Sequence, residues 1–279
     1  MDVNVKYVVF SSGALGGLSL IGGWQALEQL NLTSSVRGMS GCSMGSVIAT
    51  LASLSYTAEE MKTVALTVKY EDYADHSFKS LSETYGIETG RRLMRLIDRL
   101  IKFKTGRKGL TFKDHWRITG RQLWINATLV ETSKCEYYSV YTTPDMLITD
   151  AIRRSVSIPF LFASVRTEAG TYVDGGCFDP VPAHMFPMDS TICLNVRNKK
   201  IPVPVQETYI DGLFDFSSML LGGMLTELNL LRFKTQEDQG YKMVYIHTGL
   251  GSLSFSLTAE QINNVISLGL QATLKSLNL

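Results

Sequence analysis

The chain has 279 residues, of which 45% are hydrophobic and 19% are charged, and this composition excludes an intrinsically disordered protein. Its net charge of +1 provides no general attraction to nucleic acid, so we expect no nucleic-acid partner. The four cysteines include no C-x-x-C pair, which argues against a disulfide scaffold and against a zinc ribbon. We therefore expect free thiols and a cytoplasmic protein.

The first part of the chain alternates short apolar strands with helices. The sequence predicts strands at 5–10 and 35–39, and these are followed by helices at 18–30 and 46–54. Thr57 begins a T-x-x-E capping box, which predicts the start of a third helix. Residues 7–27 carry no charge, but five glycines and three serines interrupt them. We expect strand, turn and helix there, and no transmembrane helix.

The remainder of the chain continues the same alternation. Strands are predicted at 122–130, 136–141, 191–196 and 243–247. Residues 144–155 predict a helix with Pro144 in its first turn, and a capping box that begins at Thr258 opens a C-terminal helix. Short apolar strands that alternate with helices are typical of an α/β sheet with helices on both faces.

A candidate nucleophile lies in Gly41-Cys42-Ser43-Met44-Gly45, which has the form G-x-S-x-G. Between a strand and a helix, this pattern is typical of a sharp turn that exposes a reactive serine, and Gly41 and Gly45 allow the tight bend. The free N–H groups at the start of the following helix would favour a developing oxyanion. The alternative is a glycine-rich turn without catalytic function.

Two further segments carry candidate chemistry. Asp174 precedes Gly175 and Gly176, and this sequence fits an ordinary turn or a carboxylate positioned as a general base. The segment from Ser11 to Gly17 follows the first strand, and its main-chain N–H groups can converge on an anion. It lacks the spacing of a G-x-G-x-x-G loop and the G-K-[ST] of a P-loop, so nucleotide binding is a weak alternative.

Together these three segments resemble the patatin-like phospholipase family, whose members combine a glycine-rich oxyanion loop, a G-x-S-x-G and a distant D-G-[GA]. Residues 110–114, 119–120 and the serine-rich stretch 151–162 are also similar to that family. The resemblance implies a three-layer α/β/α fold with a mainly parallel central sheet. It covers 7–187 as the acyl-hydrolase core, with 188–279 as strands and helices that complete the same domain.

The resemblance also implies roles for individual residues. Ser43 would be the nucleophile and Asp174 the base, in a pair that needs no histidine, metal ion or other cofactor. The main-chain amides of Ser12, Gly13 and Ala14 would form the oxyanion hole. The family loop usually reads G-G-G-x-[RK]-G, so Ser12 and Ala14 replace glycines here and Gly16 replaces the basic residue. Ser12 and Ala14 can serve only if their backbone dihedrals avoid the glycine-only regions.

A histidine-dependent triad is an alternative, because His184 and His247 both follow Asp174 in the order Ser…Asp…His. The hydrolase fold with that triad places its nucleophile after several strands, whereas only one strand and one helix precede the predicted second strand here. The four histidines include no H-x-x-x-H, so we expect no metal site.

One basic amphipathic segment and one segment rich in Met and Leu have further candidate roles. Residues 91–108 hold eight basic residues and one acid with apolar residues at helical spacing, so Arg91, Arg92 and Arg95 are candidates for contact with an anionic membrane surface. A packed helix with a solvated basic face is the simpler interpretation. Residues 214–231 are rich in Met and Leu, and they would line an acyl pocket, form a lid or, as is more common, pack into the core.

These features predict a lipid acyl-ester hydrolase that acts through an acyl-enzyme on phospholipid or lysophospholipid. Its partner would be a lipid substrate, with peripheral membrane contact. The alternatives are a neutral-glycerolipid lipase with the same mechanism, and a weakly active or inactive patatin-like protein that binds a lipid or a protein partner.

Overall fold

The computed structural model describes residues 4–69, 72, 74, 75, 77, 83–197, 212–250 and 256–277. Its strands are β1 (Tyr7–Phe10), β2 (Gly38–Gly41), β3 (Gly86–Glu88), β4 (Gln122–Leu129), β5 (Lys134–Tyr138), β6 (Phe160–Phe162), β7 (Val165–Thr167), β8 (Gly170–Asp174), β9 (Thr191–Arg197) and β10 (Lys242–His247). Its α-helices are α1 (Ser19–Gln29), α2 (Met44–Ser53), α3 (Ala58–Thr67), α6 (Arg91–Thr105), α7 (Phe112–Thr119), α8 (Ile148–Ser155), α9 (Gly212–Asp238) and α10 (Ala259–Ser276).

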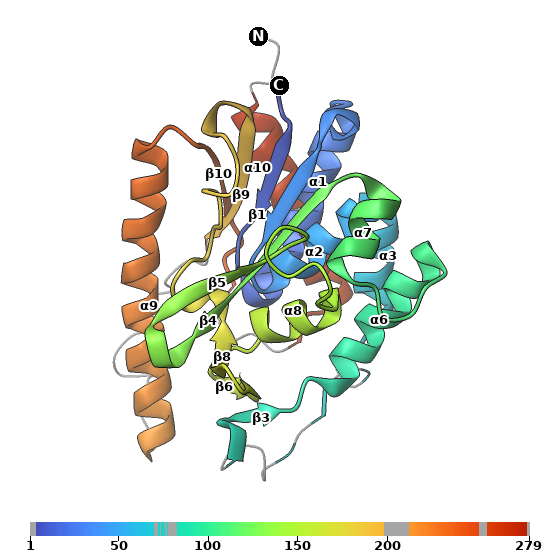
Figure 1. The fold of residues 1–279 in the computed structure, drawn as a ribbon. Coiled ribbons are helices and arrows are strands. Elements are labelled where there is room, and N and C mark those ends of the chain that lie inside the picture. Colours follow the sequence, from blue (N-terminus) through green and yellow to red (C-terminus); the bar gives the residue numbers. More distant parts are fainter. Residues whose placement is uncertain are drawn as a thin grey trace.

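A central eight-stranded sheet organises these elements (Figure 1). Its main path is β10-β9-β1-β2-β4-β8-β7, and β5 pairs with β4 outside this path. The strands from β10 to β4 are parallel, whereas β5 and β8 join β4 antiparallel and β7 joins β8 antiparallel. The predicted α/β architecture with a mainly parallel sheet is confirmed.

The two faces of the sheet are covered unequally. Val8 belongs to the larger apolar core with residues of α1, α2, α8 and α10, whereas its neighbour Val9 belongs to a smaller core on the other face. Successive residues of a strand point to opposite faces, so this alternation separates the two cores. The smaller core includes Val181 and Phe186, together with Phe233, which belongs to α9. Figure 1 shows α9 standing apart from the other helices, across the sheet.

Most predicted elements are present, although several boundaries differ. The strands predicted at 5–10 and 136–141 are observed as β1 at Tyr7–Phe10 and β5 at Lys134–Tyr138. Strand β2 begins at Gly38 because residues 33–35 form a 3-10 helix. Helix α8 begins at Ile148, so the prediction of Pro144 in its first turn is wrong. The carbonyls of Pro144 and Met146 accept hydrogen bonds from Lys113 and Phe112, and these contacts hold residues 144–146 in a connecting loop.

The uncharged run 7–27 forms β1, the 3-10 helix η1 (Ala14–Leu18) and most of α1, as predicted. Both predicted capping boxes are present, at Thr57 and Thr258. Within the described part of the chain, no helix combines the length and the apolar character needed to cross a bilayer.

Candidate active site

Two strand ends meet beside β4, and this arrangement brings distant parts of the chain together. Ile125 pairs with Gly41 of β2 and with Tyr138 of β5, so β2 and β5 lie on opposite sides of β4. Ala127 pairs with Asp174 of β8 and with Glu136 of β5, so β8 lies on the same side as β2. The carboxyl ends of β2 and β8 therefore face each other across two residues of β4, or about 7 Å.

Ser43 lies in the turn between β2 and α2, in a strained backbone conformation. Its φ of 54° and ψ of −126° are unusual for a residue with a side chain, and such conformations cost about 1–3 kcal/mol. Two serines hold this turn: the Ser43 N–H donates to Ser155 Oγ at 2.8 Å, and Ser46 Oγ donates to the Ser43 carbonyl at 2.6 Å. Although Ser43 is at the N-cap position, its hydroxyl does not cap α2, so it remains free for another partner.

The two glycines of the G-x-S-x-G segment lie where a side chain would collide with backbone. A Cβ at Gly45 would lie 2.2 Å from the Phe10 carbonyl oxygen, because α2 begins directly against the end of β1. A Cβ at Gly41 would lie 2.3 Å from the Gly45 carbonyl oxygen. Close packing of the turn on the first strand therefore requires both glycines.

Asp174 ends β8 and is buried, with 5% of its surface exposed. Its Oδ1 accepts a hydrogen bond from the Gly176 N–H at 2.7 Å, and the Cys42 thiol lies 3.9 Å from the same oxygen. Its Oδ2 has no hydrogen-bond partner among the described residues. Burial raises the pKa of Asp174 to about 6, against smaller lowering effects of the Ser43 side chain, the Gly176 amide and Cys42. The Ser43 hydroxyl is therefore a close neighbour of a carboxylate that has a free oxygen.

The glycine-rich segment after β1 lies next to both groups. A Cβ at Gly176 would lie 3.0 Å from Ser12 Oγ, so this segment touches the Asp174 turn. A Cβ at Gly17 would lie 2.6 Å from the Met44 side chain, so η1 packs against the residue after Ser43. The three segments singled out in the sequence thus converge on one place.

The amides of this segment differ in availability. The Ser12 N–H donates to the Pro180 carbonyl at 2.8 Å, so the expectation that it forms part of an oxyanion hole is corrected. The amides of Gly13 and Ala14 make no hydrogen bond to any described residue, and both residues are half-buried. Ala14 has a φ of 46°, a left-handed conformation that favours glycine. This conformation is strained for alanine but is not restricted to glycine, so the Ala14 N–H group remains available.

The C-terminal part of the chain fixes the same segment in place. Ser11 Oγ accepts a hydrogen bond from the Val196 N–H at 2.9 Å and donates to the Ser12 carbonyl. The Ser11 N–H donates to the Leu194 carbonyl of β9. The backbone of β9 therefore sets where the Gly13 and Ala14 amides lie.

Two buried serines in the 151–162 stretch were not assigned roles from the sequence. Ser155 bonds the Ser43 amide, and the Ser157 carbonyl accepts a hydrogen bond from the Asp174 N–H at 2.9 Å. Arg153 Nη1 donates to Ser157 Oγ at 2.6 Å. One turn at the end of α8 thus contacts the backbone of both Ser43 and Asp174. The serine-rich composition was the only signal, and it does not reveal these partners.

The described histidines lie elsewhere. His247 ends the edge strand β10, separated from β2 by β9 and β1, which is about 14 Å across the sheet. His184 faces Asp179, with Nδ1 3.6 Å from Oδ2. His115 is buried, its ring bonds Ser53, and burial lowers its pKa to about 4. None of the three hydrogen-bonds to Ser43 or Asp174, and His76 lies outside the described residues.

The basic segment and the Met- and Leu-rich segment form helices α6 and α9. Helix α6 buries Ile97 and Ile101, and its residues Arg91, Arg92 and Arg95 are exposed. The expectation that the Met- and Leu-rich segment packs into the core is wrong for the described side chains of α9. Seven of its large apolar residues are exposed: Phe216, Met219, Leu220, Met224, Leu228, Leu230 and Leu231.

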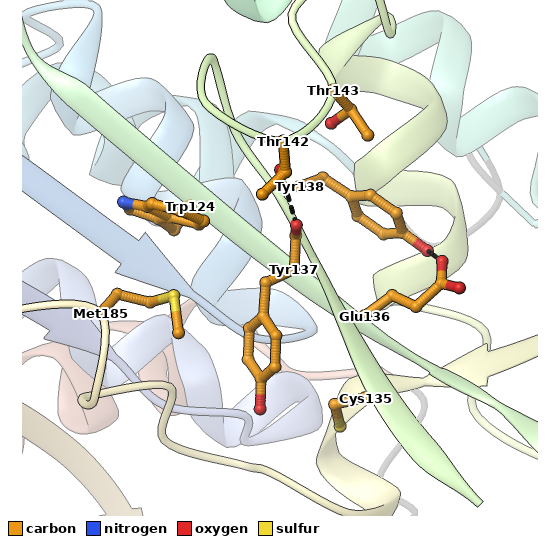
Figure 2. A pocket seen from close by; sticks show the side chains of 8 residues that line it. All are labelled: Trp124, Cys135, Glu136, Tyr137, Tyr138, Thr142, Thr143 and Met185. Atoms are coloured by element: carbon orange, nitrogen blue, oxygen red, sulfur yellow. Dashed lines mark hydrogen bonds between the residues drawn. The ribbon is translucent and has the colours of Figure 1, made fainter. Parts of the chain in front are cut away.

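A hollow of about 500 Å³ opens on β4 and β5, where Trp124, Tyr137 and Tyr138 form part of its lining (Figure 2). Neither Ser43 nor Asp174 lines it. It adjoins the Asp174 turn through Cys135, whose sulfur lies 3.7 Å from the Gly175 carbonyl oxygen. The hollow is therefore a neighbour of the site and not its entrance.

Comparison with known proteins agrees with this geometry. The model of the family described as "Patatin-like phospholipase" matches residues 8–187. Protein R571 of Acanthamoeba polyphaga mimivirus is 24% identical over 97% of this chain and 93% of its own length. "Probable lipid hydrolase 463L" of Invertebrate iridescent virus 6 is 28% identical over 70% of this chain and 65% of its own length.

Solved structures show the same fold. VipD from Legionella pneumophila superposes with a TM-score of 0.62 at 18% identity, over 99% of this chain and 67% of VipD. The family match includes both the Ser43 and the Asp174 segments. The chain therefore belongs to the patatin-like phospholipase family.

Proposed function

We propose that this chain hydrolyses acyl esters of lipids, with Ser43 as nucleophile and Asp174 as general base. Ser43 Oγ attacks the ester carbonyl carbon while its proton passes to the free Oδ2 of Asp174. The tetrahedral oxyanion is stabilised by the amides of Gly13 and Ala14 and by the start of α2. The leaving alcohol takes the proton, and an acyl-enzyme remains. Water then repeats the sequence and releases the fatty acid.

The main observation behind this proposal is that the carboxyl ends of β2 and β8 face each other along the same side of β4. It supports direct proton transfer from serine to carboxylate, because Asp174 lies beside the Ser43 turn and one of its oxygens is unpaired. A carboxylate with a pKa near 6 is a better base for a hydroxyl than an ordinary aspartate. The described histidines make no hydrogen bond to this pair, which favours the two-residue mechanism over a triad.

The substrate class follows from the family and from the viral relative named as a probable lipid hydrolase. Phospholipid or lysophospholipid is the preferred substrate, and neutral glycerolipid is the alternative. We place the catalytic groups in residues 7–187, and we assign to residues 188–279 the completion of the sheet that supports the loop.

A weakly active protein is the second candidate, and one observation favours it. Ala14 takes a left-handed conformation in the segment where relatives usually have glycine, and Gly16 replaces their basic residue. This candidate predicts lipid binding with little turnover.

The test is turnover on a panel of phosphatidylcholine, lysophosphatidylcholine, triacylglycerol and a soluble short-chain ester. We expect fatty acid release from at least one lipid, and Ser43→Ala should lower turnover by at least about a thousandfold, as expected when a covalent nucleophile is removed. The control is Ser34→Ala, an exposed serine that bonds only to the Asn31 carbonyl. Equal turnover by Ser43→Ala and the control would refute the assignment, and binding without turnover would favour the weakly active protein.

A further inference from the structure

Helix α9 presents an apolar face to solvent between Phe216 and Leu231. Phe216, Leu220, Met224 and Leu231 are all at least half exposed, and Met224 reaches 62%. At 100° per residue, the seven exposed apolar residues fall on one side of the helix, with Glu227 as a charged residue among them. Exposed apolar surface of this extent marks a binding surface in most proteins.

The C-terminal end of α9 fixes the helix to the body of the protein. Phe233 is buried in the smaller core, and Arg197 lies over its ring at 4.8 Å. Gln236 donates to the Val181 carbonyl, and Glu237 accepts a hydrogen bond from Tyr245. The apolar face therefore belongs to a helix that is anchored at one end.

The free half of α9 points toward the end of the molecule that holds the site. Figure 1 shows the beginning of α9 extending past the sheet at the end where the parallel strands finish. Ser43 follows the carboxyl end of β2, and Asp174 is the last residue of β8. Both residues therefore lie at this end of the sheet. A surface that contacted this half of α9 would therefore lie close to the proposed catalytic pair.

Helix α6 begins at the same end (Figure 1). Several of its basic side chains have no ion-pair partner among the described residues. Arg91, Arg95, Arg99 and Lys102 share one side of the helix, and their side chains make no ion pair or hydrogen bond with any described residue. The acid of this helix, Asp98, accepts a hydrogen bond from the Gly109 N–H. Phe103, next to this side, is 78% exposed. Like charges at this spacing repel one another, so an anionic surface would stabilise them.

We propose that the exposed face of α9 inserts into the interfacial region of an anionic phospholipid bilayer while the basic side of α6 contacts the headgroups, so that Ser43 is held at the lipid surface. This inference rests on the proposed lipid hydrolysis, because such an enzyme must approach a lipid surface to obtain its substrate. The two helices supply the two components that interfacial binding requires, an apolar insertion and a cationic contact. A second copy of this chain is a poorer occupant, because it would present the same basic α6 to this end.

The experiment measures binding of the Ser43→Ala protein to vesicles, so that no hydrolysis alters them. Vesicles of phosphatidylcholine with 30% phosphatidylserine are compared with vesicles of phosphatidylcholine alone, at low and high salt. We expect the double substitution Leu220→Gln and Met224→Gln to weaken binding by about 30-fold, if each side chain contributes about 1 kcal/mol on partial burial. Arg95→Gln with Arg99→Gln should weaken binding to the anionic vesicles by about 30-fold, since each basic residue near such a surface contributes about 1 kcal/mol.

Matched controls lie at the other end of the strands. Met188 is exposed and precedes β9, and Lys242 is exposed at the start of β10. Met188→Gln and Lys242→Gln should leave vesicle binding unchanged, and circular dichroism checks that every variant is folded. All these variants should retain turnover of the soluble short-chain ester in the Ser43 background, which separates membrane binding from catalysis.

Three results would overturn the proposal. One is binding by the α9 variant that equals binding by the Met188→Gln control. The second is binding that does not depend on phosphatidylserine or on Arg95 and Arg99. The third is a dimer in light scattering that the α9 substitutions dissociate, with no binding to vesicles, because the face would then be an interface between copies of this chain. None of these results depends on whether Ser43 is the nucleophile.

Discussion

In the proposed mechanism, burial of the Asp174 carboxyl serves catalysis at the expense of stability. In water an aspartate ionises near pH 3.9 and is a weak base for a serine hydroxyl. Burial disfavours the charged form and raises the pKa to about 6, so the ionised carboxylate has a stronger tendency to accept a proton. A protein that needs this carboxylate in its ionised form at neutral pH must keep a costly charge in its interior.

Asp174→Asn is therefore expected to stabilise the protein while it removes activity. The folded-state pKa exceeds the unfolded value, so this carboxyl stabilises the fold below about pH 4, and its contribution declines as the pH rises through about 6. A difference of about two pKa units corresponds to roughly 3 kcal/mol. We expect the asparagine variant to gain up to that amount in free energy of unfolding at pH 8, and much less at pH 4, in urea titrations.

The matched control is Asp145→Asn, because the Asp145 side chain is 85% exposed. Its stability should equal that of the wild type at both pH values. If Asp174→Asn is destabilising at pH 8, the carboxylate is held by interactions stronger than its burial cost, and the account of its raised pKa fails.

The elements around the site approach one another so closely that a single Cβ atom matters. Helix α2 begins against the Phe10 and Ser11 carbonyls, and η1 packs on Met44. Such close contacts leave no room for a Cβ at Gly45, whereas Ala14 already has one in a left-handed conformation. The two positions should therefore respond in opposite ways to exchange between glycine and alanine.

We expect Gly45→Ala to destabilise the protein by about 3 kcal/mol, because backbone must move to relieve the contact. Ala14→Gly should change the free energy of unfolding by less than about 1 kcal/mol, since relief of left-handed strain offsets the greater freedom of glycine in the unfolded chain. Thermal unfolding and ester turnover measure both effects. A tolerated Gly45→Ala would contradict the packing of α2 on β1.

The sequence predicted which segments converge but not how their atoms meet. The G-x-S-x-G segment, the Asp174 turn and the loop after β1 were found from residue types at recognisable spacing. The residues that hydrogen-bond these segments could not be predicted from residue types and spacing. Ser155, Pro180 and Val196 are distant in sequence, and only the folded chain brings them into contact with the segments. The exposed side of α9 was missed for a related reason. Its composition fits a core helix, and only the folded structure reveals that nothing described covers it.

At the scale of the whole molecule, the last third of the chain supplies the strand that positions the loop after β1. Strand β9 lies between β1 and β10, and its Leu194 and Val196 bond the loop that carries Gly13 and Ala14. The family match ends at residue 187, before this strand. Without β9, β1 would become an edge strand and lose the backbone partners on one of its two sides.

A chain that ends at Pro187 should therefore fail to fold cooperatively. Removal of β9, α9, β10 and α10 exposes the Val8 and Phe10 side chains and leaves α1 without α10. We expect loss of a sigmoidal thermal transition and no ester turnover, measured by circular dichroism and with the soluble ester. A folded, active fragment would show that residues 188–279 form a separate unit.

The most direct measurement of the central claim is covalent labelling by a fluorophosphonate probe as a function of pH, followed by mass spectrometry of the labelled peptide. We predict a single labelled residue, Ser43, with a rate that rises with pH and is half-maximal near pH 6, because only ionised Asp174 accepts the proton. In Asp174→Asn the rate should fall by at least about a hundredfold and lose this pH dependence. Labelling at another serine, or at Ser43 with equal rates in both proteins, would contradict the account.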